Sequence, residues 1–248
     1  MLDKEMLLHN AALEIKRANG QTIALTGAGI SVASGIPAFR GMGGLWEKYD
    51  PEEYATIDAF RANPGKVWQM LKEFKEVIEK ARPNPAHQAL ARLEQMGCLR
   101  AVITQNVDGL HQEAGNTNVI EFHGNNRLVV CLKCGEKYPN DRLNLETLPP
   151  YCPCGGVLKP DAVFFGEPIP WAALSRAREE AQSCRVVLVV GTSAVVEPAA
   201  SIPYLARRAG AVIIEVNPER ALFSDIFLSG PAEEILPSLV AEVDALPL

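Results

Sequence analysis

The sequence predicts an α/β fold, a Rossmann-like parallel sheet of about six strands with helices on both faces. Short apolar runs alternate with helical patterns along the chain, as expected when a parallel sheet is covered on both sides. Two segments interrupt the alternation, and they predict a helical insertion at about 42–82 and a cysteine-rich insertion at about 125–160. The predicted strands lie at residues 23–26, 99–104, 119–122, 185–190, 211–216 and 225–228.

The length and composition are those of one core-bearing unit. We expect the 248 residues to form a single core whose Rossmann-like part comprises 1–41, 83–124 and 161–248. A formal net charge of −6 disfavours duplex nucleic acid as the main partner, because phosphate binding needs a basic surface. No apolar run approaches the roughly 18 residues of a membrane span. The acidic start of the chain does not resemble a secretion signal, so we expect a cytoplasmic protein.

The first helix is predicted at 3–19, with Asp3 as its N-cap and Gly20 as its stop. The strand at 23–26 then leads into a glycine-rich stretch, 27–41. Glycines let the backbone approach a ligand closely, and the amides that open the next helix can face an anion. The third position of the usual dinucleotide fingerprint is Val32, however, and Arg40 adds a cation that a hydride-transfer site would not need. The stretch therefore predicts a nucleotide-phosphate site of another kind.

The helical insertion contains one clear helix start, at Asn63-Pro64, where a capping residue precedes a first-turn proline. The apolar side chains that follow fall on one face, which indicates core packing of a helical module. They are Val67, Trp68, Leu71, Phe74 and Ile78.

Polar clusters follow four of the predicted strands, at 27–40, 105–108, 191–193 and 217–219. Ligands of parallel sheets lie at the carboxyl ends of the strands, so these clusters predict one shared site. Gln105, Asn106 and Asp108 can both donate and accept hydrogen bonds, which suits ribose hydroxyls and an amide. The residues alone leave a second interpretation open, in which Asp108 only caps the next helix.

His123 lies at the end of the predicted strand 119–122 and precedes a glycine. A histidine in this position is suited to be a general base, because its pKa lies near working pH. A hydrogen-bonded structural histidine is the alternative. His9, His87 and His111 lie within or beside helical patterns and fit a structural role, with His111 packed behind the polar loop.

Four cysteines form two close pairs, Cys131-x2-Cys134 and Cys152-x-Cys154, with 17 residues between the pairs. Four thiolates can close a tetrahedral zinc site, which would be structural because it has no open position. Free-thiol pairs or a redox pair are the alternative, and the single residue within the second pair departs from the usual spacing of two. Cys98 and Cys184 adjoin predicted strands and fit ordinary buried thiols.

Taken together, these motifs resemble the sirtuin family over about residues 8–240. The resemblance implies NAD-dependent removal of acyl groups from protein lysines. NAD is consumed, and nicotinamide and O-acyl-ADP-ribose are released. A mono-ADP-ribosyltransferase on the same NAD site and a non-enzymatic reader, with the zinc module as its interaction surface, are the alternatives. The matching stretches are 27–31, 35–40, 104–111, 122–124, 165–167, 191–193, 216–217 and the cysteine pairs.

The resemblance also implies roles for single residues. His123 would take a proton from a ribose hydroxyl, and Asn106 would take part in catalysis within the nicotinamide pocket. Zinc would bind Cys131, Cys134, Cys152 and Cys154. The implied NAD contacts are Gly27, Ala28, Gly29, Ile30, Ser31, Ala38, Phe39, Arg40, Gln105, Asn106, Val107, Asp108, Gly191, Thr192, Ser193, Asn217, Pro218, Glu219 and Ala232.

The implied partner is an acylated-lysine protein or peptide, with no nucleic acid and no membrane. Its backbone would pair as an added strand with Val163, Phe164, Phe165, Gly166 and Glu167. Relatives that remove succinyl or malonyl groups carry a Tyr-x-x-Arg pair where this chain has Leu71 and Phe74. A buried acyl carboxylate would lack its cation there, so neutral acyl groups are predicted to be preferred. Ala38 stands where relatives often carry Asp or Thr.

Overall fold

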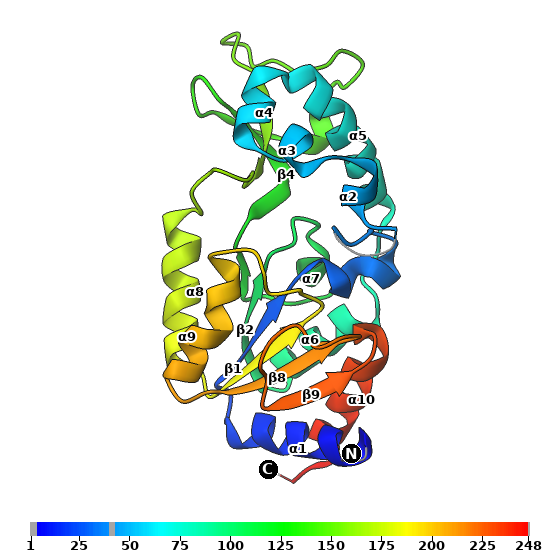
Figure 1. Cartoon of the computed structure of the whole chain (residues 1–248), viewed down its shortest axis with the longest axis vertical. Coiled ribbons are helices and arrows are strands. Elements are labelled where there is room, and N and C mark those ends of the chain that lie inside the picture. The colour runs from blue at the N-terminus through cyan, green and yellow to red at the C-terminus, as the bar shows by residue number, and fades with distance from the viewer. Residues whose placement is uncertain (1–3, 40–42, 248) are drawn as a thin grey trace.

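A six-stranded parallel sheet forms the core of the half of the molecule that carries the chain termini (Figure 1). The computed structural model describes residues 4–39 and 43–247. The strand order is β3-β2-β1-β7-β8-β9, so the predicted α/β class is confirmed. Every strand begins and ends within one residue of its predicted bounds: β1 (Thr22–Thr26), β2 (Leu99–Thr104), β3 (Val119–Glu121), β7 (Val186–Val190), β8 (Val212–Asn217) and β9 (Ile226–Ser229).

The central strands β1 and β7 are buried along their whole length. They pair in parallel from Thr22 with Val186 to Thr26 with Val190. The chain runs from β1 outward through β2 and β3, and β7 to β9 extend the sheet on the other side. The strand order therefore reverses between β1 and β7, which is where ligands of this kind of sheet bind.

Helices cover both faces of the sheet (Figure 1). On one face, α1 (Lys4–Arg17), α6 (Pro85–Gln95) and α10 (Ala232–Ala245) pack over one core cluster. On the other, α8 (Trp171–Ser183) and α9 (Ile202–Arg208) pack over a second cluster. Along β1, Ala24 belongs to the first cluster, whereas Ile23 and Leu25 belong to the second, as the two-residue period of a strand requires.

The first helix ends at Arg17, two residues earlier than predicted. Asn19 and Gly20 have φ angles of 48° and 77°, a left-handed conformation that ends a helix. The predicted N-cap, Asp3, lies outside the described residues. Across the described ranges, none of the helices has the length and apolarity needed to cross a bilayer.

The segment after the glycine-rich stretch is helical, as predicted. It contains α2 (Leu45–Lys48), α3 (Pro51–Tyr54), α4 (Ile57–Ala62) and α5 (Pro64–Lys80). The Asn63 side chain accepts a hydrogen bond from the Lys66 amide and caps α5. The predicted apolar stripe of α5 divides between two clusters. Val67, Trp68 and Leu71 belong to a core shared with the cysteine-rich segment, whereas Phe74 and Ile78 pack beside Ile36 and Leu110.

The cysteine-rich segment contains a second sheet, which the sequence did not predict. It is antiparallel, in the order β5-β4-β6, with strands β4 (Gly124–Cys131), β5 (Lys137–Pro139) and β6 (Leu158–Ala162). Together with α2–α5 it forms the end of the molecule opposite the chain termini (Figure 1). Four short helices complete the part of the chain that the structure describes: η1 (Ala28–Ser34), α7 (Leu110–Glu113), η2 (Asn140–Arg142) and η3 (Ala199–Ser201).

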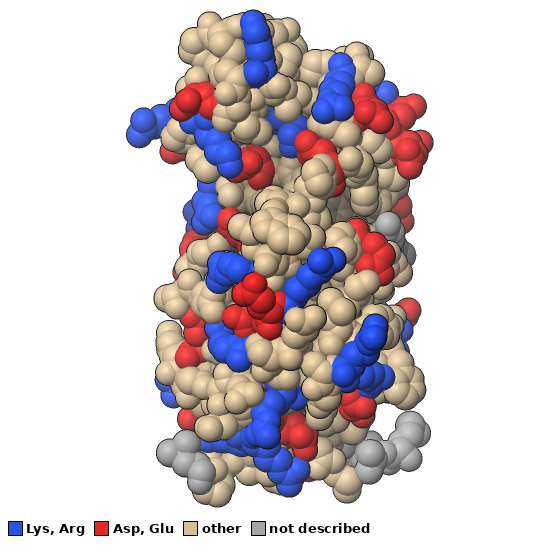
Figure 2. All heavy atoms as spheres, turned by 90° about the vertical axis from the view of Figure 1, so that its left-hand side faces the viewer, with Lys and Arg blue, Asp and Glu red and all other residues tan. Residues whose placement is uncertain are grey.

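Basic and acidic side chains are interspersed on the face that carries α8 and α9 (Figure 2). This distribution fits the excess of six negative charges in the sequence. On this face, the charges do not gather into the continuous basic surface that a duplex nucleic acid needs.

Candidate active site at the strand ends

Gly27 and Gly29 bring two loops together backbone to backbone. The Gly29 amide donates to the Gly191 carbonyl at 2.8 Å. A Cβ atom on Gly29 would lie 2.7 Å from the Gly191 Cα, and one on Gly27 would lie 2.7 Å from the Thr192 Cβ. Neither glycine can carry a side chain without moving the loop after β7. The stretch is therefore fixed by the fold as well as suited to a close ligand.

Asn106, Ser31 and Asp108 form a buried hydrogen-bond chain behind this loop. The Asn106 Nδ2 donates to the Gly27 carbonyl and to the Ser31 Oγ, both at 3.1 Å. The Ser31 Oγ in turn donates to the Asp108 Oδ2 at 2.8 Å. The other carboxylate oxygen accepts from the Leu110 amide at 3.0 Å. Asp108 thus fits both interpretations of the sequence at once, since it binds the start of α7 and the polar site.

Burial acts on the Asp108 carboxyl group and raises its pKa. The hydrogen bonds from the Leu110 amide and the Ser31 hydroxyl oppose this effect, because they stabilise the charged form. A carboxylate in this environment has few water molecules around it. It can therefore orient polar neighbours and a ligand amide more strongly than an exposed one would.

The loops after β2, β7 and β8 meet through side chains that the sequence placed at strand ends. The Gln105 Nε2 donates to the Thr192 Oγ1 at 3.0 Å. Asn217 binds the Thr192 backbone twice, since its Oδ1 accepts from the amide and its Nδ2 donates to the carbonyl, each at 3.1 Å. The buried Glu215 carboxylate accepts from Asn217 and from the Ala221 amide. The structure thus brings the four predicted polar clusters to one edge of the sheet.

The other predicted site residues have contacts of their own or are exposed. Phe39 is stacked on Trp46 at 5.2 Å between ring centroids, and the Ala38 carbonyl accepts from the Leu45 amide. Arg40 lies outside the described residues. Ala28 is half-buried, and Ile30 and Ala232 are buried in the same core cluster. The Val107 carbonyl accepts from the Asn126 amide of β4. Ser193, Pro218 and Glu219 are exposed.

His123 lies directly after β3, where β4 begins. Its Nδ1 is 3.1 Å from the Gln105 carbonyl oxygen, which can only accept, so Nδ1 carries a proton. Burial lowers the pKa of His123 below its ordinary value of 6.5, and the bond to Gln105 opposes this. The imidazole is therefore neutral at pH 7, and its Nε2 is free of a proton. This arrangement is that of a general base.

A polar network that the sequence did not predict lies beneath the site. The Thr26 Oγ1 donates to the Thr104 Oγ1 at 2.9 Å and also contacts the His111 Nε2 at 2.9 Å. His87 lies 5.0 Å from His111 between ring centroids, and its Nε2 is 3.4 Å from the Ser31 Oγ. Burial lowers the pKa of His87 to about 4 and that of His111 to about 3. One signal in the sequence points to this network. The strands β1 and β2, which both lead into polar clusters, each end in threonine.

The four paired cysteines gather at one point of the small sheet. Their sulfur atoms all lie within 4.8 Å of one another. The Sγ atoms of Cys131 and Cys154 are 3.5 Å apart, and those of Cys134 and Cys152 are 3.7 Å apart. A tetrahedral zinc ion with bonds of about 2.3 Å separates its sulfurs by about 3.8 Å. The donor set therefore fits structural zinc, and not a disulfide.

The segment Val163–Glu167 joins the two sheets. The Val163 amide donates to the His123 carbonyl at 2.9 Å. Phe165 pairs with the segment before α4, since its amide donates to the Ala55 carbonyl and its carbonyl accepts from the Ile57 amide, each at 2.9 Å. Among the described residues, the amide and carbonyl of Gly166 have no backbone partner. The amide and carbonyl of Gly166 are therefore available to pair with a substrate strand.

A family model described as the Sir2 family matches residues 27–198. This chain belongs to the Sir2 family. It is 53% identical over 225 residues to the NAD-dependent protein deacylase 2 of Pyrobaculum aerophilum, which covers 89% of this chain and 90% of the relative. It is also 53% identical over 233 residues to the NAD-dependent protein deacylase of Pyrococcus abyssi, covering 90% of this chain and 93% of the relative. The predicted sirtuin family and enzyme class, an NAD-dependent protein deacylase, are confirmed.

Solved Sir2 structures share the whole fold. One, from a study of the mechanism and regulation of Sir2 enzymes, has a TM-score of 0.90 at 44% identity and covers 98% of this chain and all of the other. A Sir2 homologue solved with NAD has a TM-score of 0.85 at 41% identity, covering 98% and 94%. Sir2Af2 bound to a myristoylated histone peptide has a TM-score of 0.80 at 39% identity, covering 97% of each chain.

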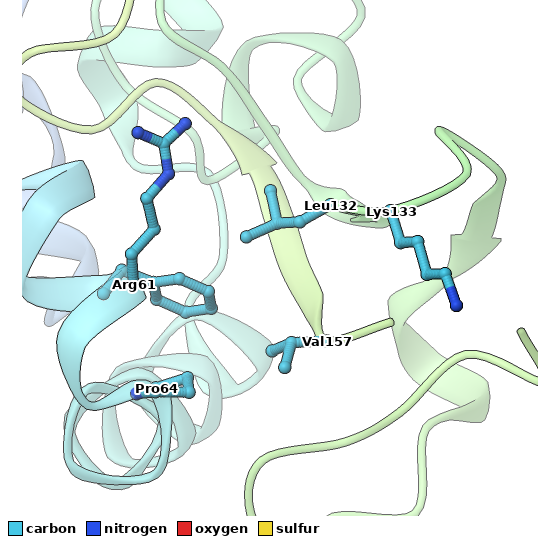
Figure 3. A pocket seen from close by; sticks show the side chains of 6 residues that line it. Arg61, Pro64, Leu132, Lys133 and Val157 are labelled. Atoms are coloured by element: carbon cyan, nitrogen blue, oxygen red, sulfur yellow. The ribbon is translucent and has the colours of Figure 1, made fainter. Parts of the chain in front are cut away.

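This Sir2 protein also has a cavity away from the strand ends (Figure 3). Its volume is about 220 Å³, and it lies between α4, the start of α5 and the turn that carries the first cysteine pair. None of its lining residues was predicted for the active site. They are Phe60, Arg61, Pro64, Leu132, Lys133 and Val157.

Proposed function

We propose that the strand-end site binds NAD and transfers an acyl group from a protein lysine to ADP-ribose, releasing nicotinamide. The observation that carries the proposal is the neutral, hydrogen-bonded His123 beside the Asn106–Ser31–Asp108 chain. The similar Sir2 homologue solved with NAD supports the choice of co-substrate. The glycine loop, the Thr192 loop and Asn217 lie together where the phosphates and the adenosine half would be held.

The proposed chemistry uses His123 as a base. With Nδ1 bound to the Gln105 carbonyl, Nε2 is the atom that can take a proton from a ribose hydroxyl. Before this step, the acyl oxygen of the lysine amide would displace nicotinamide at the ribose carbon, which converts the amide into an O-alkylamidate. The hydroxyl, with its proton passed to His123, would then add to the amidate carbon and open its C=N bond. Water would finally release free lysine and O-acyl-ADP-ribose. General-base help of this kind contributes about 10²–10⁴-fold to a rate. Because the site is lined by groups already bound to one another, little reorganisation is needed when the substrates enter.

The test compares wild type with His123→Ala on an acetyl-lysine peptide and NAD, with the products identified by mass spectrometry. We expect O-acetyl-ADP-ribose from wild type and a loss of at least about a hundredfold in the variant. His9→Ala, an exposed histidine paired with Glu242, is the matched control. Retained deacetylation in folded His123→Ala would exclude His123 as the base. ADP-ribosylated protein in place of O-acetyl-ADP-ribose would favour the mono-ADP-ribosyltransferase.

We also propose a preference for neutral acyl groups. Phe74 of α5 lies 6.5 Å from Phe39 between ring centroids. Leu71 is half-buried in the neighbouring apolar core. An acyl carboxylate placed against these side chains would lose its hydration without gaining a cation, at a cost of several kcal/mol. The Sir2Af2 structure with a myristoylated peptide supports testing long neutral chains as well.

Three peptides of one sequence, carrying acetyl-, myristoyl- or succinyl-lysine, test this preference. We expect kcat/KM to be at least about tenfold lower for succinyl than for acetyl. The double variant Leu71→Tyr/Phe74→Arg introduces the Tyr-x-x-Arg pair of relatives that remove succinyl groups. It should reduce the difference in kcat/KM between the acetyl-lysine and succinyl-lysine peptides. Faster removal of succinyl than acetyl by wild type would refute the proposal.

A further inference from the structure

Lys159 of β6 is a buried lysine that the active site does not use. It is 4% exposed, and a buried ammonium ion is costly unless all its protons are bound. Its Nζ is 2.6 Å from the Ala162 carbonyl oxygen, 3.0 Å from the Pro160 carbonyl oxygen and 3.0 Å from the Glu167 Oε2. The ammonium therefore binds its own strand end and the segment that follows it.

The ring of Phe164 provides a fourth contact. The Lys159 Nζ lies 4.5 Å from the centre of this ring, a favourable position for a cation. The edge of the ring packs against Phe60 at 5.5 Å between centroids. Phe164 is thus held between a cation and an aromatic side chain. Burial lowers the pKa of Lys159, and the hydrogen bond and the charge of Glu167 oppose this shift.

Glu167 connects the ion pair with Lys159 to the backbone of the segment. The Oε2 atom that binds Lys159 also accepts from the Phe164 amide at 2.8 Å. The Glu167 amide donates to the Phe164 carbonyl at 3.0 Å. This closes a tight turn in which Gly166 has a φ angle of 88°, a conformation that favours glycine. Both backbone groups of Phe164 are therefore bound within the turn.

We propose that Lys159 is a positioning residue for the peptide substrate. Through Glu167 it holds the turn at 164–167 so that the amide and carbonyl of Gly166 face an incoming strand. The inference rests on the proposed function of Val163–Glu167 as the peptide-binding segment. A buried ion pair adds little net stability, because the cost of removing its charges from water offsets their attraction. What this pair supplies is a fixed position for the carboxylate, and hence for the Phe164 amide.

The central test is Lys159→Met, which keeps the length of the side chain and removes its charge. We expect the KM for an acetyl-lysine peptide to rise about tenfold, as for a lost hydrogen bond to a charged group. The KM for NAD should stay within about twofold, because the NAD site has its own hydrogen-bond chain. Lys159→Arg keeps the charge and should restore most of the peptide affinity. A folded Lys159→Met with unchanged peptide KM, or with both KM values raised alike, would overturn the proposal.

A matched control lies on the same sheet. Lys137 of β5 pairs with Asp161 of β6 at 2.6 Å, and its side chain is 52% exposed. Lys137→Met also removes one cation from an ion pair, but it does not touch the turn. Its peptide KM should stay within about twofold of wild type, because exposed pairs contribute little. A tenfold rise in this control would show a general effect of charge and would overturn the assignment to Lys159.

Glu167→Gln is the second variant, and it carries the test if Lys159→Met does not fold. The amide oxygen of Gln can still accept from the Phe164 amide, so we expect a smaller rise in peptide KM, about threefold to fivefold. Anisotropy of a fluorescent acetyl-lysine peptide measures binding directly in the same variants. An unchanged peptide affinity in folded Glu167→Gln would contradict the proposal.

Phe165→Ala separates this inference from the proposed function. If Phe165→Ala weakens peptide binding and Lys159→Met does not, the segment binds peptide but Lys159 does not position it. If wild type binds the peptide without removing the acetyl group, the proposed reaction fails. In that case, the anisotropy of the fluorescent peptide with the Lys159 variants still tests whether Lys159 positions the peptide. If wild type does not bind the peptide, both proposals are wrong.

Discussion

The strand-end site and the four-cysteine cluster are held in two different ways. At the strand ends, each polar side chain is bound to a loop that follows a fully buried strand, as Asn106 is to Gly27 and Gln105 is to Thr192. The cluster lies on a sheet of three short strands, and two of its cysteines, Cys134 and Cys154, are exposed. The first site is therefore shaped by the packing of the large sheet. The second needs an ion to hold its turns together.

Removing zinc should give the largest effect, because a structural zinc site contributes about 10 kcal/mol to the folding of a small unit. We expect Cys152→Ser, or treatment with a chelator, to unfold the small sheet and abolish deacylation. Binding of ADP-ribose, measured by calorimetry, should change by only about threefold because its site lies on the large sheet. Cys98→Ser, outside the cluster, is the control. If zinc-free protein kept its deacylase activity, the inference that the cysteine cluster needs a metal ion would be wrong.

Acid should destabilise the large sheet next most strongly. His87 has a pKa of about 4 in the folded protein against an ordinary 6.5, so between these values the unfolded chain binds more protons. The contribution of His87 to the free energy of unfolding is therefore complete above pH 6.5. It decreases by about 3 kcal/mol as the pH drops towards 4. His111 acts in the same direction.

Urea unfolding of zinc-loaded protein between pH 7.5 and pH 4 measures this dependence. His87→Gln should flatten the curve, whereas Gln88→Ala, at an exposed neighbouring position without a titratable group, should leave it unchanged. An equal pH dependence in all three proteins would show that the buried histidines do not determine acid stability.

The smallest effect concerns one link between loops. Gln105→Ala removes the hydrogen bond to Thr192 that links the two loops, and a longer one of 3.3 Å to the Thr26 carbonyl, but leaves the Asn217–Thr192 pair intact. One neutral hydrogen bond contributes about 1 kcal/mol, so the KM for NAD should rise about fivefold. The exposed Gln88 provides a control as Gln88→Ala. A loss of deacylation as large as that caused by zinc removal would mean that the strand-end site depends on this single link more than we infer.

The sequence predicted the large sheet well, because its strands are short, mostly apolar runs that alternate with helical patterns, as a parallel sheet covered on both faces requires. It missed the small sheet for a physical reason. The register of β4 against β6 shifts between Gly124 and Val129, and β5 has only three residues, so no alternating pattern develops. The exact division of the chain at 42–82 and 125–160 stays a prediction.

At the site, the sequence indicated which residues converge but not how they bind one another. Strand ends are visible as polar clusters after apolar runs, and so Gln105, Asn106 and Asp108 were found. The contact of Thr26 with His111 depends on how α7 packs, which local patterns do not specify. Lys159 lies in Leu-Lys-Pro-Asp-Ala, a sequence typical of an exposed strand, and only the surrounding loops bury it.

The pairing of β1 with β7 has a consequence for how the protein is made. Thr22 pairs with Val186, so the middle strand of the large sheet must wait while both insertions are synthesised. Contacts between such distant residues form slowly, because a long loop has to close before they contribute. The cysteine-rich sheet, in contrast, is complete in sequence by Ala162. On the ribosome, the small sheet can therefore take up its metal before the catalytic edge exists.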